Sequence, residues 1–193
     1  MTALPPFELG VSNGWILLVA YGIGLLLALV PFSKDDRLRL FADPKVHLRG
    51  LKRIALHIGQ FVAVGFIVLM LFTPITHAPG LVLVGTSIYV LGYSTVLIAL
   101  RYFRRATVGH PATHGPYRVS RNPQWVGLFL VLLGAAITSG AWLMVVMVLL
   151  VGCVYHIQIL EEEKACSTLY GEPYLKYLRQ VPRYFLLLLI GAA

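Results

Sequence analysis

Three long stretches without a charged side chain constrain this chain more than any other feature of its sequence. They are the 25 residues between Glu8 and Lys34, the 47 between Arg53 and Arg101, and the 39 between Arg121 and Glu161. One α-helix needs about 20 apolar residues to cross a bilayer, so these windows have room for one, two and two crossings. The sequence therefore predicts an all-α integral membrane protein with five transmembrane helices.

The composition agrees with this class. The chain of 193 residues is 58% hydrophobic and 12% charged, about half the charged share of a typical soluble domain. The expected spans are Trp15–Phe32, Ile54–Phe72, Leu81–Leu100, Gln124–Ile137 and Ala141–Leu160. The fourth is short and only Thr138-Ser139-Gly140 separates it from the fifth, which predicts a tight helical hairpin that tilts or thins the lipid around it.

The basic residues predict the orientation. All sixteen Lys and Arg fall in the first loop, the third loop and the region after the last span, whereas the N-terminus and the other two connections carry none. By the positive-inside rule these regions are cytoplasmic, so the N-terminus lies outside and the C-terminus inside. Anionic lipid headgroups are a sufficient partner for the net charge of +8, and nucleic acid is not expected. We expect a multi-pass protein of a prokaryotic cytoplasmic membrane, with its site on the cytoplasmic face and an oligomeric state that the sequence leaves open.

Glycine spacing gives one packing expectation. Gly85 and Gly92 lie seven residues apart in the third span, on one face of the helix, and they could permit close packing there.

The first of two polar clusters is the stretch GHPATHGPYRVSRNPQWVG, from Gly109 to Gly127. Arg121 offers a planar fork for a carboxylate or phosphate. Pro123 can start the fourth helix with Asn122 at its N-cap position. The free N–H groups of that helix end favour an anion such as a carboxylate.

The second cluster runs from Glu161-Glu162-Glu163 to Arg183. Three acids at the end of the fifth helix oppose its dipole, so a cation is expected to compensate them. That cation could be Arg121, Arg183, a lipid amine or a cofactor. We predict that the two clusters meet at one face of the membrane and bind a charged cofactor there.

Two other interpretations of these clusters remain open. The Arg and Glu residues could form interfacial ion pairs that only mark the ends of the spans. A metal site is less favoured, because Pro111 interrupts the helix that would align His110 and His114, and no H-E-x-x-H is present. No Walker loop or G-x-G-x-x-G occurs either, which argues against a soluble nucleotide site.

The residues of both clusters resemble a known family. GPYRVSRNPQWVG is similar to the G-x-Y-x-x-x-R-[HN]-P-x-[YW]-x-G signature of the isoprenylcysteine carboxyl methyltransferase family. Glu162-Glu163, the stretch from Tyr170 to Tyr177, and Val181-Pro182-Arg183-Tyr184 resemble the family's later elements in order and spacing. The resemblance covers Arg101 to Phe185, nearly half of the chain.

The resemblance implies a membrane methyltransferase that uses S-adenosylmethionine and takes a lipophilic acceptor sideways from the bilayer. It implies catalytic roles for Tyr117, Glu163 and Arg183. The implied cofactor-binding residues are Thr113, His114, Gly115, Tyr117, Arg121, Asn122, Pro123, Glu162, Glu163, Tyr174 and Tyr177. Residues 101–185 would then be the catalytic core, 1–100 three preceding spans with a basic loop, and 186–193 an apolar tail.

Three positions depart from the family pattern. Pro111-Ala112-Thr113-His114 stands where the family often has H-x-L-V-T, Asn122 replaces a frequent His, and Cys166 replaces an apolar Leu. Losing a possible proton acceptor at position 122 is tolerable if the acceptor is a carboxylate, which is already a nucleophile at neutral pH. Such a transfer needs mainly a close, water-free approach to the methyl carbon.

Other functions remain as alternatives. A phospholipid N-methyltransferase carries a similar pattern with paired acids, and a sterol-type reductase using NADPH is a more distant enzyme option. A non-catalytic scaffold would need neither Tyr117 nor the Glu pair. A transporter is disfavoured because no charged residue lies within a span and no repeated broken helices occur.

Overall fold

The computed structural model describes residues 1–8, 10–41, 50–107 and 109–184, and all regular elements in these ranges are helical apart from isolated bridges. In chain order they are α1 (Trp15–Leu29), α2 (Lys34–Phe41), α3 (Leu51–Phe72), α4 (Pro79–Arg104), the 3-10 helix η1 (Gly115–Arg118), α5 (Pro123–Ser139), α6 (Trp142–Tyr170) and α7 (Glu172–Gln180). The predicted apolar tail, 186–193, lies outside the described residues.

Three of these helices, α3, α4 and α6, are long and apolar enough to cross a membrane. The apolar helices α1 and α5 have 15 and 17 residues, somewhat short of the roughly 20 that one crossing needs. The all-helical membrane class is thus supported. Five crossings and their orientation stay predictions.

The sequence placed the end of the fifth apolar helix too early. The expected boundary was Leu160, but α6 continues through the glutamates to Tyr170. Glu, Lys and Ala are good helix formers, so nothing in Glu161–Ala165 interrupts the backbone. The helix ends at Gly171, whose φ of 63° lies in the left-handed region that glycine adopts at low cost.

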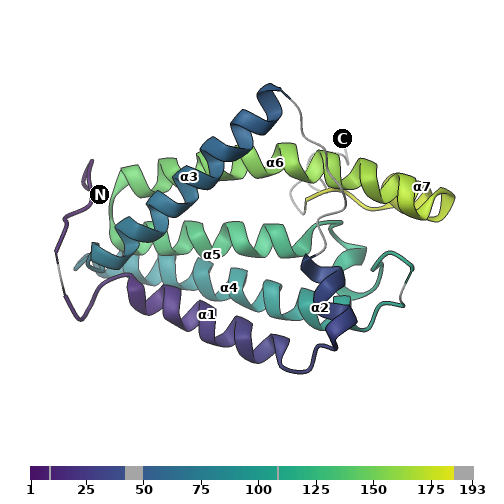
Figure 1. Cartoon of the computed structure of the whole chain (residues 1–193). Coiled ribbons are helices and arrows are strands. Elements are labelled where there is room, and N and C mark those ends of the chain that lie inside the picture. Colours follow the sequence, from purple (N-terminus) through teal and green to yellow (C-terminus); the bar gives the residue numbers. More distant parts are fainter. Residues whose placement is uncertain (9, 42–49, 108, 185–193) are drawn as a thin grey trace, which may run out of the picture.

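Close packing of α4 on α5 forms the centre of the bundle, and the two helices run side by side in Figure 1. Small residues permit it: a Cβ added to Gly92 would lie 2.6 Å from the carbonyl oxygen of Gly127 on α5. A Cβ on Gly85 would lie 2.8 Å from the carbonyl oxygen of Gly134. The predicted role of Gly85 and Gly92 in close packing is confirmed.

The remaining helices surround this pair. α6 returns along α5 after a tight turn at Gly140, whose φ is 69°, which confirms the predicted hairpin. α3 packs on α6, and α1 contacts both α3 and α4 (Figure 1). Buried apolar side chains from α3, α4, α5 and α6 form the main core, with Met70 and Met144 fully buried at its centre.

The N-terminus and the two connections without Lys or Arg, which the charge pattern assigned to the same side, meet at one end of the bundle. Thr2 donates its backbone N–H to the carbonyl of Gly140, and Glu8 donates to that of Phe72. At the other end Arg104 donates to the carbonyl of Pro31, and Arg39 donates to that of Ala106. The two polar clusters belong to this second, basic end.

Candidate functional site

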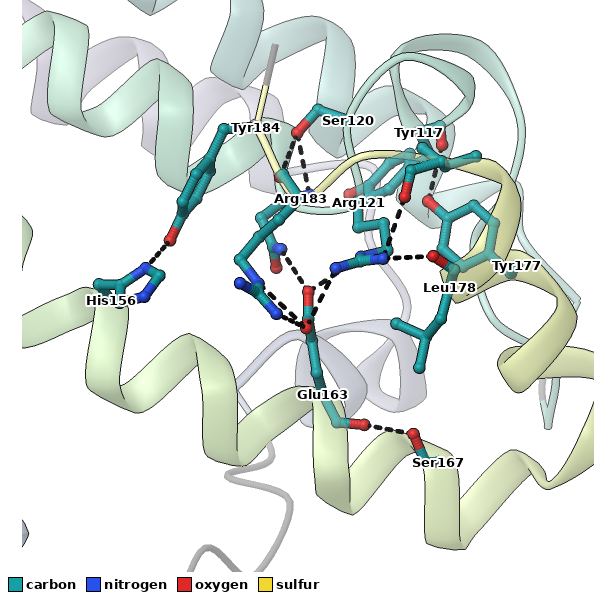
Figure 2. A network of polar contacts seen from close by, with 12 residues as sticks. Tyr117, Ser120, Arg121, His156, Glu163, Ser167, Tyr177, Leu178, Arg183 and Tyr184 are labelled. Atoms are coloured by element: carbon teal, nitrogen blue, oxygen red, sulfur yellow. Dashed lines mark hydrogen bonds and ion pairs between the residues drawn. The ribbon is translucent and has the colours of Figure 1, made fainter. Parts of the chain in front are cut away.

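Glu163 lies at the centre of an ion cluster that joins the two polar stretches. Its carboxylate accepts from Arg121 Nε at 3.0 Å and from the Arg121 terminal nitrogen at 3.3 Å. Arg183 donates to the same carboxylate at 3.1 and 2.8 Å, and Asn122 Nδ2 donates at 3.2 Å. Figure 2 shows both guanidinium groups converging on this one acid. Two cations share one anion, so the cluster has an excess positive charge.

Helix geometry brings these groups together. Glu163 projects from α6, while Arg121 and Asn122 immediately precede α5. Arg121 also donates to the carbonyls of Leu178 and Val181 at 2.6 and 3.0 Å. These carbonyls lie at the C-terminal end of α7, where a cation is favoured by the helix dipole. The guanidinium therefore ties α5, α6 and α7 into one unit.

The segment after α7 lies against the loop before α5. Arg121 donates its backbone N–H to the carbonyl of Pro182 at 3.0 Å, and Ser120 Oγ donates to the carbonyl of Arg183 at 2.8 Å. Ser120 is fully buried by this contact. Further along, the hydroxyl of Tyr184 lies 2.8 Å from Nδ1 of His156 on α6. We call residues 181–184 the C-terminal strap.

Two tyrosines support the loop from the other side. Tyr177 on α7 donates its hydroxyl to the carbonyl of Tyr117 at 2.6 Å, and both side chains are buried. Burial raises the pKa of both phenols well above their ordinary value. Both therefore remain protonated donors at neutral pH.

A pocket of about 170 Å³ opens beside this cluster. One wall is polar, with Arg121, Asn122, Gln124, Glu162 and Glu163, and much of the rest is aromatic. Its lining residues come from the end of α4, the loop with η1, the start of α5, the second half of α6, and α7: Phe103, Pro111, Ala112, Tyr117, Arg121, Asn122, Pro123, Gln124, Trp125, Glu162, Glu163, Cys166, Tyr170, Tyr174 and Tyr177.

Most of the predicted site residues meet in this pocket. Those that line it are Tyr117, Arg121, Asn122, Pro123, Glu162, Glu163, Tyr174 and Tyr177. Thr113, His114 and Gly115 lie in the same loop but outside the lining. Arg183 reaches the pocket only through its ion pair with Glu163. The binding and catalytic roles of all these residues stay predictions.

Three acids behave differently from one another, which the sequence left open. Glu161 turns away from the pocket and pairs with Lys52 at 2.7 Å and Lys164 at 3.0 Å. Glu162 lines the pocket and accepts from Gln158 at 2.8 Å. The expected clash with the helix dipole was wrong, because α6 continues for two more turns and the acids lie in its interior.

Several lining residues were not predicted to belong to the site. Phe103 lies in the last turn of α4, Cys166 and Tyr170 lie one turn apart on α6, and Gln124 and Trp125 lie in the first turn of α5. The spacing of Glu162, Cys166 and Tyr170 at i, i+4 and i+8 places them on one helix face. That periodicity was the available signal for the two α6 residues.

Comparison with protein families decides the relationship of this chain. The family model of phospholipid methyltransferase matches residues 58–173. The chain belongs to the phospholipid methyltransferase family. The match begins in α3 and ends in α7, so it includes the pocket-lining residues from Phe103 to Tyr170 but not Tyr174 and Tyr177. It excludes α1, α2 and the C-terminal strap. No curated protein and no solved structure matches the chain.

The family assignment supports a membrane methyltransferase, but the family that matches differs from the one that the sequence motifs resemble. The family found belongs to the same membrane methyltransferase superfamily as the isoprenylcysteine carboxyl methyltransferases, but that specific family is not confirmed.

Proposed function

We propose that the chain is an S-adenosylmethionine-dependent methyltransferase that acts on a lipophilic acceptor at the basic end of the bundle. The observation that carries this proposal is the convergence of the loop 117–125 and of Glu162 and Glu163 on one pocket. This convergence lies within the part of the chain that matches the family.

The residues of the pocket fit the proposed cofactor. S-adenosylmethionine carries a sulfonium, an ammonium and a carboxylate, together with an adenine ring. The pocket offers the acid Glu162 for the cations, Arg121 for the carboxylate, and aromatic surface from Phe103 and Tyr170 for the ring. The cofactor supplies an electrophilic methyl group, which a nucleophilic acceptor takes by in-line displacement.

Glu163 and Glu162 have different roles in this proposal. Five N–H groups from Arg121, Asn122 and Arg183 already donate to its carboxylate. We therefore assign Glu163 to positioning: it holds Arg121 at the pocket wall and anchors the C-terminal strap through Arg183. Glu162 is the acid that faces the ligand's positive charge.

The acceptor belongs to one of two chemical classes. An isoprenylcysteine-type carboxylate needs no proton removal. This class suits the pocket, because Asn122 stands where the isoprenylcysteine carboxyl methyltransferases frequently have a histidine. A phosphatidylethanolamine-type amine agrees with the family that matches, but it must lose a proton. In that case we assign the proton to Glu162, a carboxylate that lines the pocket.

Calorimetric titration of S-adenosylhomocysteine into the detergent-purified protein tests the proposal. We expect saturable binding by the native protein and a loss of at least tenfold in affinity for Glu162→Gln, since a charge-assisted contact is worth about 1.5–3 kcal/mol. Glu172→Gln is the matched control, because Glu172 is exposed on α7. Failure of well-folded native protein to bind in detergent and in lipid would contradict the proposal.

A further inference from the structure

Two buried hydrogen-bond donors in the pocket have no partner within the described part of the chain. They are the hydroxyl of Tyr117 and the side-chain nitrogen of Gln124. The Tyr117 residue is only 6% exposed, and both residues line the pocket. Buried donors are nearly always paired in native proteins. Two unpaired donors in one pocket point to a ligand that supplies the missing acceptor.

The start of α5 adds further donors at the same place. Asn122 occupies the N-cap position, but its side chain makes no cap bond there and donates instead to Glu163. Pro123 has no N–H, so the free amides of the first turn belong to Gln124 and Trp125. This 17-residue helix directs the positive end of its dipole toward the pocket.

Positive charge from Arg121 accompanies these donors, on a wall that also carries Glu162 and Glu163. Arg121 precedes the helix by two residues and lines the same pocket. Its ion cluster with Glu163 and Arg183 combines two cations with one anion. A neutral acceptor would not balance the excess positive charge of this ion cluster. An anionic oxygen would accept from the two donors and balance that charge as well.

We infer that Gln124 and Tyr117 form a donor pair that holds an anionic oxygen of the bound ligand at the N-terminal end of α5. The inference deepens the proposed function and rests on it. The oxygen belongs either to the carboxylate of the cofactor or to the carboxylate or phosphate of the lipophilic acceptor. Gln124 is thereby a specificity-determining residue, which selects ligands that carry such an oxygen.

Titrations with three probes separate the two sources. The probes are S-adenosylhomocysteine, its decarboxylated analogue, and N-acetyl-S-farnesylcysteine or phosphatidylethanolamine added to protein saturated with S-adenosylhomocysteine. Each is measured with native protein, Gln124→Leu, Gln124→Glu and Tyr117→Phe. Gln180→Leu is the matched control, because Gln180 is exposed at the end of α7.

If the oxygen belongs to the cofactor, Gln124→Leu lowers the affinity for S-adenosylhomocysteine by about tenfold. The affinity for the decarboxylated analogue then stays unchanged. If it is the acceptor's, both nucleoside probes keep their affinity and the lipid probe loses about tenfold. In either case Gln124→Glu lowers the affinity for that probe more than Gln124→Leu does, because it places a like charge beside the oxygen. Tyr117→Phe affects the same probe as Gln124→Leu.

Thermal unfolding supplies a second measurement. Replacing an unpaired buried donor by an apolar group is neutral or stabilising, so Gln124→Leu should keep or raise the unfolding midpoint while it weakens binding. A lowered midpoint would show that the amide has a structural partner and would overturn the inference. Native affinity of the Gln124 variants for every probe would also overturn it while leaving the proposed function intact. Absence of S-adenosylhomocysteine binding by the native protein would overturn both.

Discussion

Arg121 and Glu163 form a two-point ion pair between the loop before α5 and the middle of α6, with donor–acceptor distances of 3.0 and 3.3 Å. Only 10% and 8% of the two side chains are exposed, so this pair is shielded from water. Removing one partner leaves an unpaired buried charge, which is costly. The pair thus joins the stability of the fold to the geometry of the pocket.

We predict that Glu163→Gln lowers the free energy of unfolding by about 3–5 kcal/mol, because it leaves Arg121 and Arg183 facing each other without their anion. Thermal or denaturant unfolding in detergent measures the change. Glu161→Gln is the control on the same helix, since Glu161 pairs with two exposed lysines. Equal effects of the two substitutions would contradict a structural role for the Glu163 cluster.

The glycine contacts between α4 and α5 give a second prediction. Gly92→Ala should destabilise the protein by about 1–3 kcal/mol, because its Cβ would meet backbone atoms of α5 that cannot move aside. Gly22→Ala on α1 is the matched control, since nothing lies within 4 Å of a Cβ there. Helix propensity favours Ala over Gly, so Gly22→Ala should keep or raise the thermal midpoint. A midpoint that changes equally in both variants would contradict a role for the contact at Gly92.

The C-terminal strap depends on Ser120. Ser120→Ala removes the bond to the Arg183 carbonyl and the bond from the Asn122 backbone N–H. It should increase hydrogen exchange at the amides of residues 181, 183 and 184, with a loss of about 0.5–1.5 kcal/mol in stability for each bond. Ser167→Ala is a suitable control, because Ser167 donates to the carbonyl of Glu163 within its own helix. Unchanged exchange in the strap would show that Pro182 and Tyr184 hold it without Ser120.

The buried phenols predict a dependence on alkaline pH. Burial raises the pKa of Tyr177 above its ordinary value of 10.0, so the unfolded chain releases this proton at a lower pH than the folded protein. The contribution to stability is fully present below pH 10 and is lost as the pH rises above it. Tyr177→Phe should reduce the fall in unfolding midpoint between pH 9 and 11. An unchanged pH profile would contradict a buried, neutral Tyr177.

Local sequence signals predicted the start of α5 and the position of its turn correctly. Pro123 begins the helix with Asn122 before it, and Gly140 ends it in the left-handed conformation. These features depend on the conformational preferences of a few adjacent residues. They could be derived because proline restricts the backbone conformations available to the chain and glycine extends them, wherever these residues occur.

The pocket could be derived only in part. Opposite charges on the two clusters made Arg121 and Arg183 two of several candidate partners for the glutamates. Only the rotation of α6 selects Glu163 for both arginines and directs Glu161 to Lys52. Phe103 reaches the pocket because α4 continues past its apolar stretch. Such choices depend on helix rotation and length, which the distant parts of the chain decide together.

Transfer of a labelled methyl group tests the central claim most directly. The native protein, reconstituted in vesicles that contain phosphatidylethanolamine and N-acetyl-S-farnesylcysteine, is given methyl-labelled S-adenosylmethionine, and the lipid extract is analysed. We predict label in the lipid fraction, as a base-labile methyl ester or as a methylated amine, and far less with Glu162→Gln than with Glu172→Gln. The two forms of label distinguish the acceptor classes. Protein that binds S-adenosylhomocysteine but leaves both lipids unlabelled would contradict transfer to these acceptors, and protein that neither binds nor transfers would contradict the methyltransferase account itself.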